Sequence, residues 1–161
     1  MKILWAPWRS AYVTGQEKNE KCIFCQKIHG DDKENLVLWR GKSCFAVLNI
    51  YPYNNGHLMI APYRHTPSLN EMSEEEKLEI MQALTLLLDV LKEALNCDGF
   101  NIGMNIGKVA GAGVPDHIHL HIVPRWEGDT NFMPVIGDTK VIPQSLSSTY
   151  ETLKRVLDKR R

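Results

Sequence analysis

The stretch DHIHLHIV, residues 116–123, alternates three histidines with apolar residues. Successive side chains of a β-strand point to opposite faces, so this alternation predicts a strand that turns Ile118, Leu120 and Ile122 toward a core. The three histidines then share the other face, with about 6.6–7 Å between residues two apart. The chain has only 6 histidines, and no Ser, Thr or Lys interrupts this row, which is unusual for a solvated sheet face. The row therefore predicts a site with imidazole chemistry.

Other short apolar segments predict the neighbours of this strand. The predicted strands are NLVLW (35–39), CFAVLNI (44–50), GHLMIAP (56–62) and GFNIGMNI (99–106). A tight turn joins the first two, and a Gly-rich segment joins the last one to the histidine stretch. Such hairpin-like runs favour an antiparallel sheet of about five strands.

Two segments predict helices. Ser73 followed by Glu76 is a capping-box signature. Apolar residues then recur at intervals of three and four, at Leu78, Met81, Leu84, Leu88, Leu91 and Leu95. A last helix is predicted in SLSSTYETLKRVLDKR, near 145–160. The fold class expected is α+β, an antiparallel sheet with two main helices covering one face.

Length and charge bound the class of protein. The 161 residues fit one domain, with a core at about 20–125 and a C-terminal helical extension at about 143–161. Nineteen basic residues balance nineteen acidic ones, so we expect no nucleic acid or membrane partner. No secretory signal and no apolar stretch of about eighteen residues is present, and we expect a cytoplasmic protein.

Residue chemistry alone leaves two interpretations of the histidine row. Imidazoles in a row can hold a catalytic metal ion that keeps an open position for water. Alternatively, one imidazole can attack phosphorus as a nucleophile, while its neighbours orient it and hold phosphate oxygens.

Several motifs together resemble the histidine-triad (HIT) superfamily of nucleotide hydrolases and transferases. HIHLHIV has the triad pattern, NIYPYNNGHLMIAPYRH (49–65) resembles the segment upstream of it, and CIFC (22–25) resembles a zinc-bearing N-terminal variant. LWAPWR near the start and PRWEGDTNFMPV (124–135) resemble a bacterial branch called diadenosine tetraphosphate phosphorylase or ATP adenylyltransferase-like. The resemblance covers nearly the whole chain and implies a HIT-like fold.

The resemblance implies a reaction and the residues that perform it. His119 would attack the α-phosphate of a dinucleoside polyphosphate or another adenylyl anhydride and form a nucleotidyl-histidine. His121 and His57 would line the same phosphate site, and Asn105 would contact the leaving side. Water and inorganic phosphate both stay open as the acceptor. No organic cofactor is expected, and a divalent cation such as Mg²⁺ can accompany the substrate.

Further positions match substrate-binding residues of the superfamily. Asn49 corresponds to the residue that binds the ribose hydroxyls. The base would lie between Ile23, Phe24 and Ile50, although ordinary core packing explains these three almost equally well. Trp126 would lie near the polyphosphate exit, or pack against a neighbouring subunit.

The Gly-rich loop supplies two more candidates. Gly111 and Gly113 could bring backbone N–H groups close to phosphate oxygens, although a plain hairpin turn explains such a loop as well. Some relatives have Ser about where Gly113 stands. The leaving-group acid is therefore not identified from the sequence.

The four cysteines divide into two kinds. Cys22 and Cys25 form a C-x-x-C pair, which is half of a metal site or a redox motif, but no helix in a βαβ setting follows it. Where the superfamily carries this pair, two histidines complete a zinc site, and the matching positions are His65 and His117. Four protein ligands leave no place for water, so the zinc would be structural. Cys44 and Cys97 are expected to be inert.

Two other functions stay open. One is a metal-dependent nucleotide hydrolase with the triad as metal ligands, and the other is a non-catalytic, nucleotide-binding regulatory module. Members of the superfamily are typically dimers, so the resemblance implies a homodimer. The helix at 73–96 or a strand edge would supply the contact.

Overall fold

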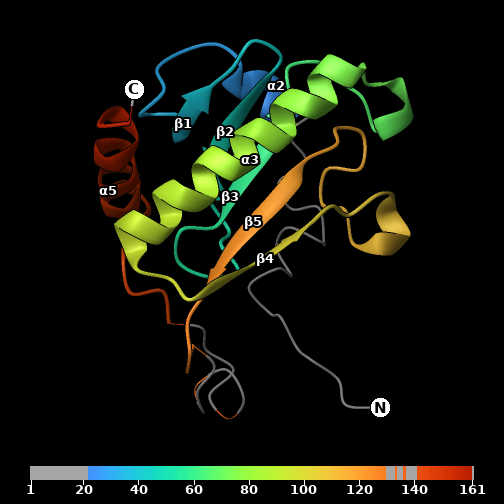
Figure 1. Ribbon diagram of the computed structural model, residues 1–161. Coiled ribbons are helices and arrows are strands. Elements are labelled where there is room, and N and C mark those ends of the chain that lie inside the picture. Colours follow the sequence, from blue (N-terminus) through green and yellow to red (C-terminus); the bar gives the residue numbers. More distant parts are fainter. Residues whose placement is uncertain (1–21, 130–132, 134–135, 137–140, 161) are drawn as a thin grey trace.

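The sheet has five antiparallel strands. The computed structural model describes residues 22–129, 133, 136 and 141–160. The strands are β1 (Val37–Arg40), β2 (Cys44–Leu48), β3 (Leu58–Pro62), β4 (Gly99–Gly103) and β5 (Leu120–Arg125). They pair in the order β1-β2-β3-β5-β4, so β1 and β4 form the two edges (Figure 1).

Two long helices cover one face of this sheet. The helix α3 (Glu74–Leu95) crosses β2, β3 and β5, and α5 (Leu146–Asp158) packs beside it against β1 (Figure 1). A short helix, α2 (Ile23–Lys27), lies over the opposite face. Two 3₁₀ turns, Leu69–Glu71 and Lys108–Ala110, lie in the connections. The predicted α+β fold with about five strands and two main helices is confirmed.

Both faces of the central strands are apolar, which places a core on each side of the sheet. In β2, Cys44, Ala46 and Leu48 join the cluster under α3, while Phe45 and Val47 join the cluster that contains Phe24 of α2. Alternating side chains point to opposite faces, so a strand buried on both sides reads as one continuous apolar run. The second cluster lies between the sheet and α2.

The helix α3 begins and ends with recognisable caps. The Ser73 hydroxyl accepts the Glu76 N–H, and the Glu76 carboxylate accepts the Ser73 N–H, which confirms the capping box. The helix ends at Asn96, whose φ of 49° puts it in the left-handed region. The buried stripe is Ile80, Ala83, Leu84, Leu87, Val90 and Leu91. Leu78 and Met81, predicted for this stripe, are 60% and 55% exposed, because this Leu-rich helix carries two overlapping apolar patterns.

The histidine stretch differs from the prediction in one respect. The strand β5 begins at Leu120, and the Ile118 N–H donates instead to the Thr66 carbonyl at 2.7 Å. His117 therefore precedes the strand. The alternation nevertheless holds, since Ile118, Leu120 and Ile122 all lie in the cluster under α3. Among the described residues, no helix combines the length and hydropathy that crossing a bilayer requires.

Candidate active site

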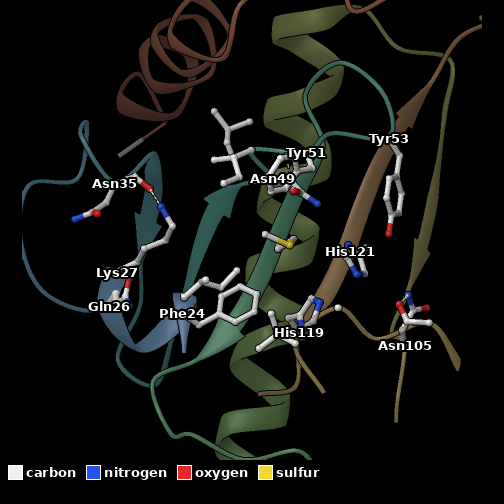
Figure 2. Close-up of a pocket in the computed structure, with 17 residues that line it drawn as sticks. Phe24, Gln26, Lys27, Asn35, Asn49, Tyr51, Tyr53, Asn105, His119 and His121 are labelled. Carbon is white, nitrogen blue, oxygen red and sulfur yellow. Dashed lines mark hydrogen bonds between the residues drawn. The ribbon is translucent and has the colours of Figure 1, made fainter. Parts of the chain in front are cut away.

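A cavity of about 300 Å³ opens on the sheet face opposite α3. Figure 2 shows His119, His121 and Asn105 at one end, Phe24 in the middle, and Gln26 and Lys27 at the other end. The strand pairing explains why the histidines reach this face. Met59 of β3 is the partner of His121 in β5, and both side chains line the cavity.

The hydrogen bonds of His119 define which of its ring nitrogens is available. Its Nδ1 lies 2.8 Å from the His117 carbonyl oxygen, and a carbonyl can only accept, so Nδ1 carries the proton. The Nε2 atom then has the lone pair. The ring is only 6% exposed and packs against Phe24, with ring centroids 4.8 Å apart. Burial lowers the pKa of His119, which favours the neutral, nucleophilic form.

A second hydrogen-bond chain fixes His57 and His121. The Tyr53 N–H donates to Nδ1 of His57 at 3.0 Å, so the proton of His57 is on Nε2. That Nε2 donates to Nδ1 of His121 at 2.9 Å. His121 therefore carries its own proton on Nε2, which makes this nitrogen a donor. The ring of Tyr53 packs over both imidazoles, with centroids 4.5 Å and 5.7 Å away.

The predicted ribose and leaving-side residues also line the cavity. Asn49 follows β2, and its side-chain oxygen accepts the Tyr51 N–H at 2.9 Å, while its amide nitrogen lies 3.4 Å from Nδ1 of His57. On the other side of the histidines, the Asn105 amide donates to the Gly111 carbonyl at 3.3 Å. These contacts orient both amides beside the imidazoles.

The Gly-rich loop contributes both predicted glycines to the cavity. Gly111 and Gly113 both line the cavity. The Gly111 N–H donates to the Lys108 carbonyl at 3.0 Å within a 3₁₀ turn, and its φ of 84° suits only glycine well. The Gly111 N–H, which the sequence suggested as a donor to phosphate, is therefore already bonded within the turn.

The predicted base-binding residues have unequal exposure. Phe24 is 1% exposed and belongs to the core below α2, while Ile50 is 46% exposed at the rim. Both line the cavity, together with Ile23. Phe24 therefore packs in the core and also lines the cavity.

Trp126 lies apart from the other predicted residues and does not line this cavity. It follows β5 at the end farthest from His119, and its indole N–H donates to the Leu95 carbonyl at 3.2 Å. The ring packs against the cluster under α3.

The cavity also contains residues that sequence reasoning missed: Gln26, Lys27, Asn35, Tyr51 and Tyr53. Tyr51 and Tyr53 stand within the 49–65 segment that carried the resemblance, so their position was a usable signal. The other three depend on α2 and on the turn after it. A five-residue helix is too short to leave a periodic pattern.

The four residues predicted to bind zinc come together behind His119. Nδ1 of His117 lies 3.3 Å from Sγ of Cys22 and 3.7 Å from Sγ of Cys25, and Nδ1 of His65 lies 3.3 Å from Sγ of Cys25. All four ligand atoms lie within 4.8 Å of one another. The Nε2 atom of His117 donates to the Pro62 carbonyl at 2.9 Å, so its Nδ1 lone pair faces the thiols.

This donor set fits zinc on chemistry, and three of its sulfur–nitrogen separations, 3.3, 3.3 and 3.7 Å, match those of a tetrahedral zinc site. Two sulfurs and two imidazole nitrogens are a common structural zinc set, and tetrahedral bond lengths separate such atoms by about 3.3–3.8 Å. The expectation that no helix in a βαβ setting follows the C-x-x-C pair holds. A short helix does begin there, with Cys22 as the N-cap of α2 and Cys25 within it. The helix has only 5 residues and precedes an antiparallel hairpin, not a βαβ unit.

Comparisons with known proteins agree with this geometry. A sequence model of the HIT domain matches residues 31–128. The AP-4-A phosphorylase of Mycobacterium tuberculosis is 40% identical over 161 residues, which cover 95% of this chain and 83% of that protein. The bis(5'-adenosyl)-triphosphatase of Dictyostelium discoideum is 29% identical over 97 residues, or 60% of this chain and 64% of that protein. The chain therefore belongs to the HIT domain family.

Solved structures give the same result for the fold. The crystal structure of a Zn-bound histidine triad family protein from Mycobacterium smegmatis matches with a TM-score of 0.70 at 25% identity. The match covers 88% of this chain and 96% of that one. The expected HIT-like fold is confirmed.

Proposed function

We propose that this protein cleaves dinucleoside polyphosphates such as diadenosine tetraphosphate through a nucleotidyl-histidine on His119. The observation that carries the proposal is the Nδ1 hydrogen bond of His119 to the His117 carbonyl, which leaves the Nε2 lone pair for attack. The names of relatives support the substrate class: an AP-4-A phosphorylase, a bis(5'-adenosyl)-triphosphatase and a bis(5'-nucleosyl)-tetraphosphatase.

The first step forms a bond between Nε2 of His119 and the α-phosphorus. The bond from that phosphorus to the bridging oxygen breaks, its electron pair stays on the oxygen, and ATP leaves diadenosine tetraphosphate. His121 donates from Nε2 to the developing charge on the phosphoryl oxygens. Asn105 lies where it can contact the leaving side. AMP remains on the histidine as a phosphoramidate.

The acceptor in the second step is inorganic phosphate in our proposal. A phosphate oxygen attacks the same phosphorus, the P–N bond breaks, and ADP is released. The support is the 40% identity with a protein named as a phosphorylase. Product analysis with and without inorganic phosphate tests this step. We expect ADP and ATP only when phosphate is present, and AMP with ATP in equal yield under both conditions would indicate a hydrolase.

The His119→Ala variant tests the nucleophile. We expect turnover of diadenosine tetraphosphate to be lost, and an acid-labile adenylylated protein to accumulate only in the wild type. The His29→Ala variant is the matched control, because His29 is exposed and does not line the cavity. Full activity of the His119→Ala variant would disprove the proposed mechanism.

The geometry favours this mechanism over a metal-dependent one. The imidazoles of the triad are not directed at one common metal position, because Nδ1 of His117 faces two thiols while Nδ1 of His119 faces a carbonyl. A purely nucleotide-binding module would bind AMP without forming the covalent intermediate. The trapping experiment therefore separates it from the enzyme.

We further propose a structural zinc ion on Cys22, Cys25, His65 and His117. The ion would hold α2 and the start of the histidine stretch in place. Metal analysis of the purified chain should find about one zinc per chain. The Cys22→Ser variant should lose zinc and melt at a lower temperature, while the Cys97→Ser variant should retain the metal.

We propose that the chain folds as one domain and forms a homodimer. β4 is the last strand of the sheet, with Ile102 45% exposed, and α3 exposes Met81 at 55%. Light scattering should give twice the chain mass. Loss of the dimer in Ile102→Glu but not in Met81→Glu would assign the contact to the strand edge. We propose the cytoplasm as its compartment, because none of the four cysteines, all of which lie in the described part of the chain, is paired in a disulfide.

A further inference from the structure

Lys27 is the one fully charged side chain among the residues that line the cavity, whose other polar members are amides, tyrosines and histidines. It is the last residue of α2 and is half-buried. Its ammonium lies at the end of the cavity away from His119 (Figure 2). A lysine in such a position requires a partner, because burial penalises its charge.

Lys27 has few partners among the described residues. Its Nζ donates to the Asn35 carbonyl at 2.7 Å. None of the ion pairs among the described residues includes Lys27. An ammonium has three N–H donors, so Lys27 presents to the cavity a charged donor that no ion pair within the described part of the chain neutralises.

The backbone beneath Lys27 is held by an arginine. Nη2 of Arg40 donates to the Lys27 carbonyl and Nη1 to the Ile28 carbonyl, each at 2.9 Å. Nε of Arg40 pairs with Asp32 at 2.7 Å. These contacts fix the end of α2, and the hydrogen bond to the Asn35 carbonyl holds the ammonium, which reduces the entropy cost of binding.

The layout of the cavity indicates what this donor meets. If the α-phosphate lies at His119 and the ribose at Asn49, as the proposed function requires, the base occupies the apolar middle beside Phe24 (Figure 2). The far edge of the base then reaches Lys27 and Asn35. This inference thus rests on the proposed function.

We propose that Lys27 determines base recognition by donating a charge-assisted hydrogen bond to a ring nitrogen of adenine. Lys27 Nζ and the Asn35 carbonyl form a donor beside an acceptor, 2.7 Å apart. Adenine offers the complement, a ring nitrogen acceptor beside its exocyclic amino donor. The carbonyl oxygen has a second lone pair that can accept from that amino group. Lys27 is therefore a specificity-determining residue, distant from the phosphorus chemistry.

Binding of AMP, measured by calorimetry, tests the proposal without any turnover. Lys27→Met keeps the length of the side chain but removes the charge and the donors. We expect it to weaken AMP binding about ten-fold, the effect of one charge-assisted hydrogen bond. Lys33→Met is the control, because Lys33 is exposed and pairs with Glu151 outside the cavity. A Lys27→Gln variant retains a neutral donor, and its affinity for AMP should lie between those of the wild type and Lys27→Met.

Analogues of AMP identify the acceptor atom. Replacing N1 or N7 by carbon, in 1-deaza-AMP or 7-deaza-AMP, should weaken binding to the wild type about ten-fold for one of the two analogues. The same analogue should bind Lys27→Met as well as AMP does, because the partner is already missing. Equal loss in both proteins, or no loss for either analogue, would overturn the proposal.

The outcomes also separate this inference from the proposed function. If Lys27→Met weakens diadenosine tetraphosphate but not AMP, the lysine binds the distal part of the substrate and the base assignment is wrong. If the wild type shows no turnover but AMP and its deaza analogues bind the wild type and Lys27→Met as expected, the proposed reaction is wrong while the base site stands. Melting temperatures of both lysine variants exclude a general loss of fold.

Discussion

Three of the imidazoles at this site have one ring nitrogen held by a backbone group, and His121 is held in turn by His57. The Pro62 carbonyl holds His117, the His117 carbonyl holds His119, and the Tyr53 N–H holds His57. Backbone groups do not titrate, so the tautomers persist wherever the rings are neutral. Three chemically equivalent side chains thereby acquire three roles. His117 directs a lone pair toward thiols, His119 directs one toward the substrate, and His121 presents an N–H donor.

The donor role of His121 leads to a prediction at a single residue. His121→Ala removes an N–H from the place where charge develops on phosphorus, and loss of one such donor costs about 10²–10³ in kcat. KM should change far less. Steady-state kinetics on diadenosine tetraphosphate would show this, with Asn70→Ala on an outer turn as a control. A rise in KM at constant kcat would mean that His121 only binds the ground state.

The buried thiols give a second prediction at this scale. Burial, together with the negative charge of Glu79, raises the pKa of Cys44 to about 12. Burial also raises the pKa of Cys97. The thiolate fraction of Cys44 at pH 8 is then about 10⁻⁴, so alkylation should be about a thousand-fold slower than for an ordinary thiol. Mass spectrometry after iodoacetamide treatment should find both residues labelled only in denaturant. Rapid labelling of Cys44 in the folded protein would contradict this.

At the scale of elements, the start of α3 depends on its cap. The Ser73 hydroxyl satisfies the Glu76 N–H, one of four donors without a partner inside the helix. Ser73→Ala should lower the free energy of unfolding by about 1 kcal/mol, measured by urea denaturation. Ser147→Ala, at an exposed position of α5, should change it by less than about 0.5 kcal/mol. Equal effects would show that the capping box contributes nothing.

Glu79 ties α3 to the turn between β1 and β2, and this tie depends on pH. Burial alone would raise the pKa of Glu79, but hydrogen bonds from the Ser43 hydroxyl and the amides of Lys42 and Ser43 lower it below 4.5. A lowered pKa means that the stabilisation is present above about pH 4.5 and is lost as the pH falls through the folded-state pKa.

Glu79→Gln should therefore cost stability at pH 7 and less at pH 3. We expect a loss of about 1–2 kcal/mol at pH 7, because the carboxylate is partly exposed, and a smaller difference from the wild type at pH 3. Urea unfolding at both pH values measures this, with the exposed Glu34→Gln as the control. The idea fails if the two proteins lose stability in parallel on acidification.

The features that the sequence predicts well are those that depend on residues close together in the chain. The capping box and spacing of α3, the alternation from Ile118 to Ile122, and the C-x-x-C pair all act through local rules, so they appear in the sequence. Very short elements and contacts between residues far apart in the chain do not appear there. The five-residue α2 has no period, and Lys27 and Asn35 reach the cavity only through tertiary packing. The choice of buried stripe on α3 likewise depends on where the sheet lies.

At the scale of the whole molecule, the two faces of the sheet have separate tasks. The face under α3 and α5 carries the large core, while the other face carries the cavity and the cysteine–histidine group. The loop from 49 to 57 connects the two sides. It contributes Asn49 and Tyr53 to the cavity, and it places Asn55 against α5, where the Thr149 hydroxyl donates to the Asn55 side-chain oxygen at 3.2 Å.

Thr149→Val tests whether this connection couples the helix to the site. Thr149 is 2% exposed, and valine has nearly its shape, so the main change is a buried Asn55 oxygen without its donor, which costs about 1–3 kcal/mol. The loop is also held by Asn54, which donates to the Pro124 carbonyl at 3.1 Å, so His57 should keep its place. We expect lower stability in urea with kcat reduced only a few-fold. If kcat falls as far as in His121→Ala while stability is unchanged, α5 positions the histidines directly and is not merely a support.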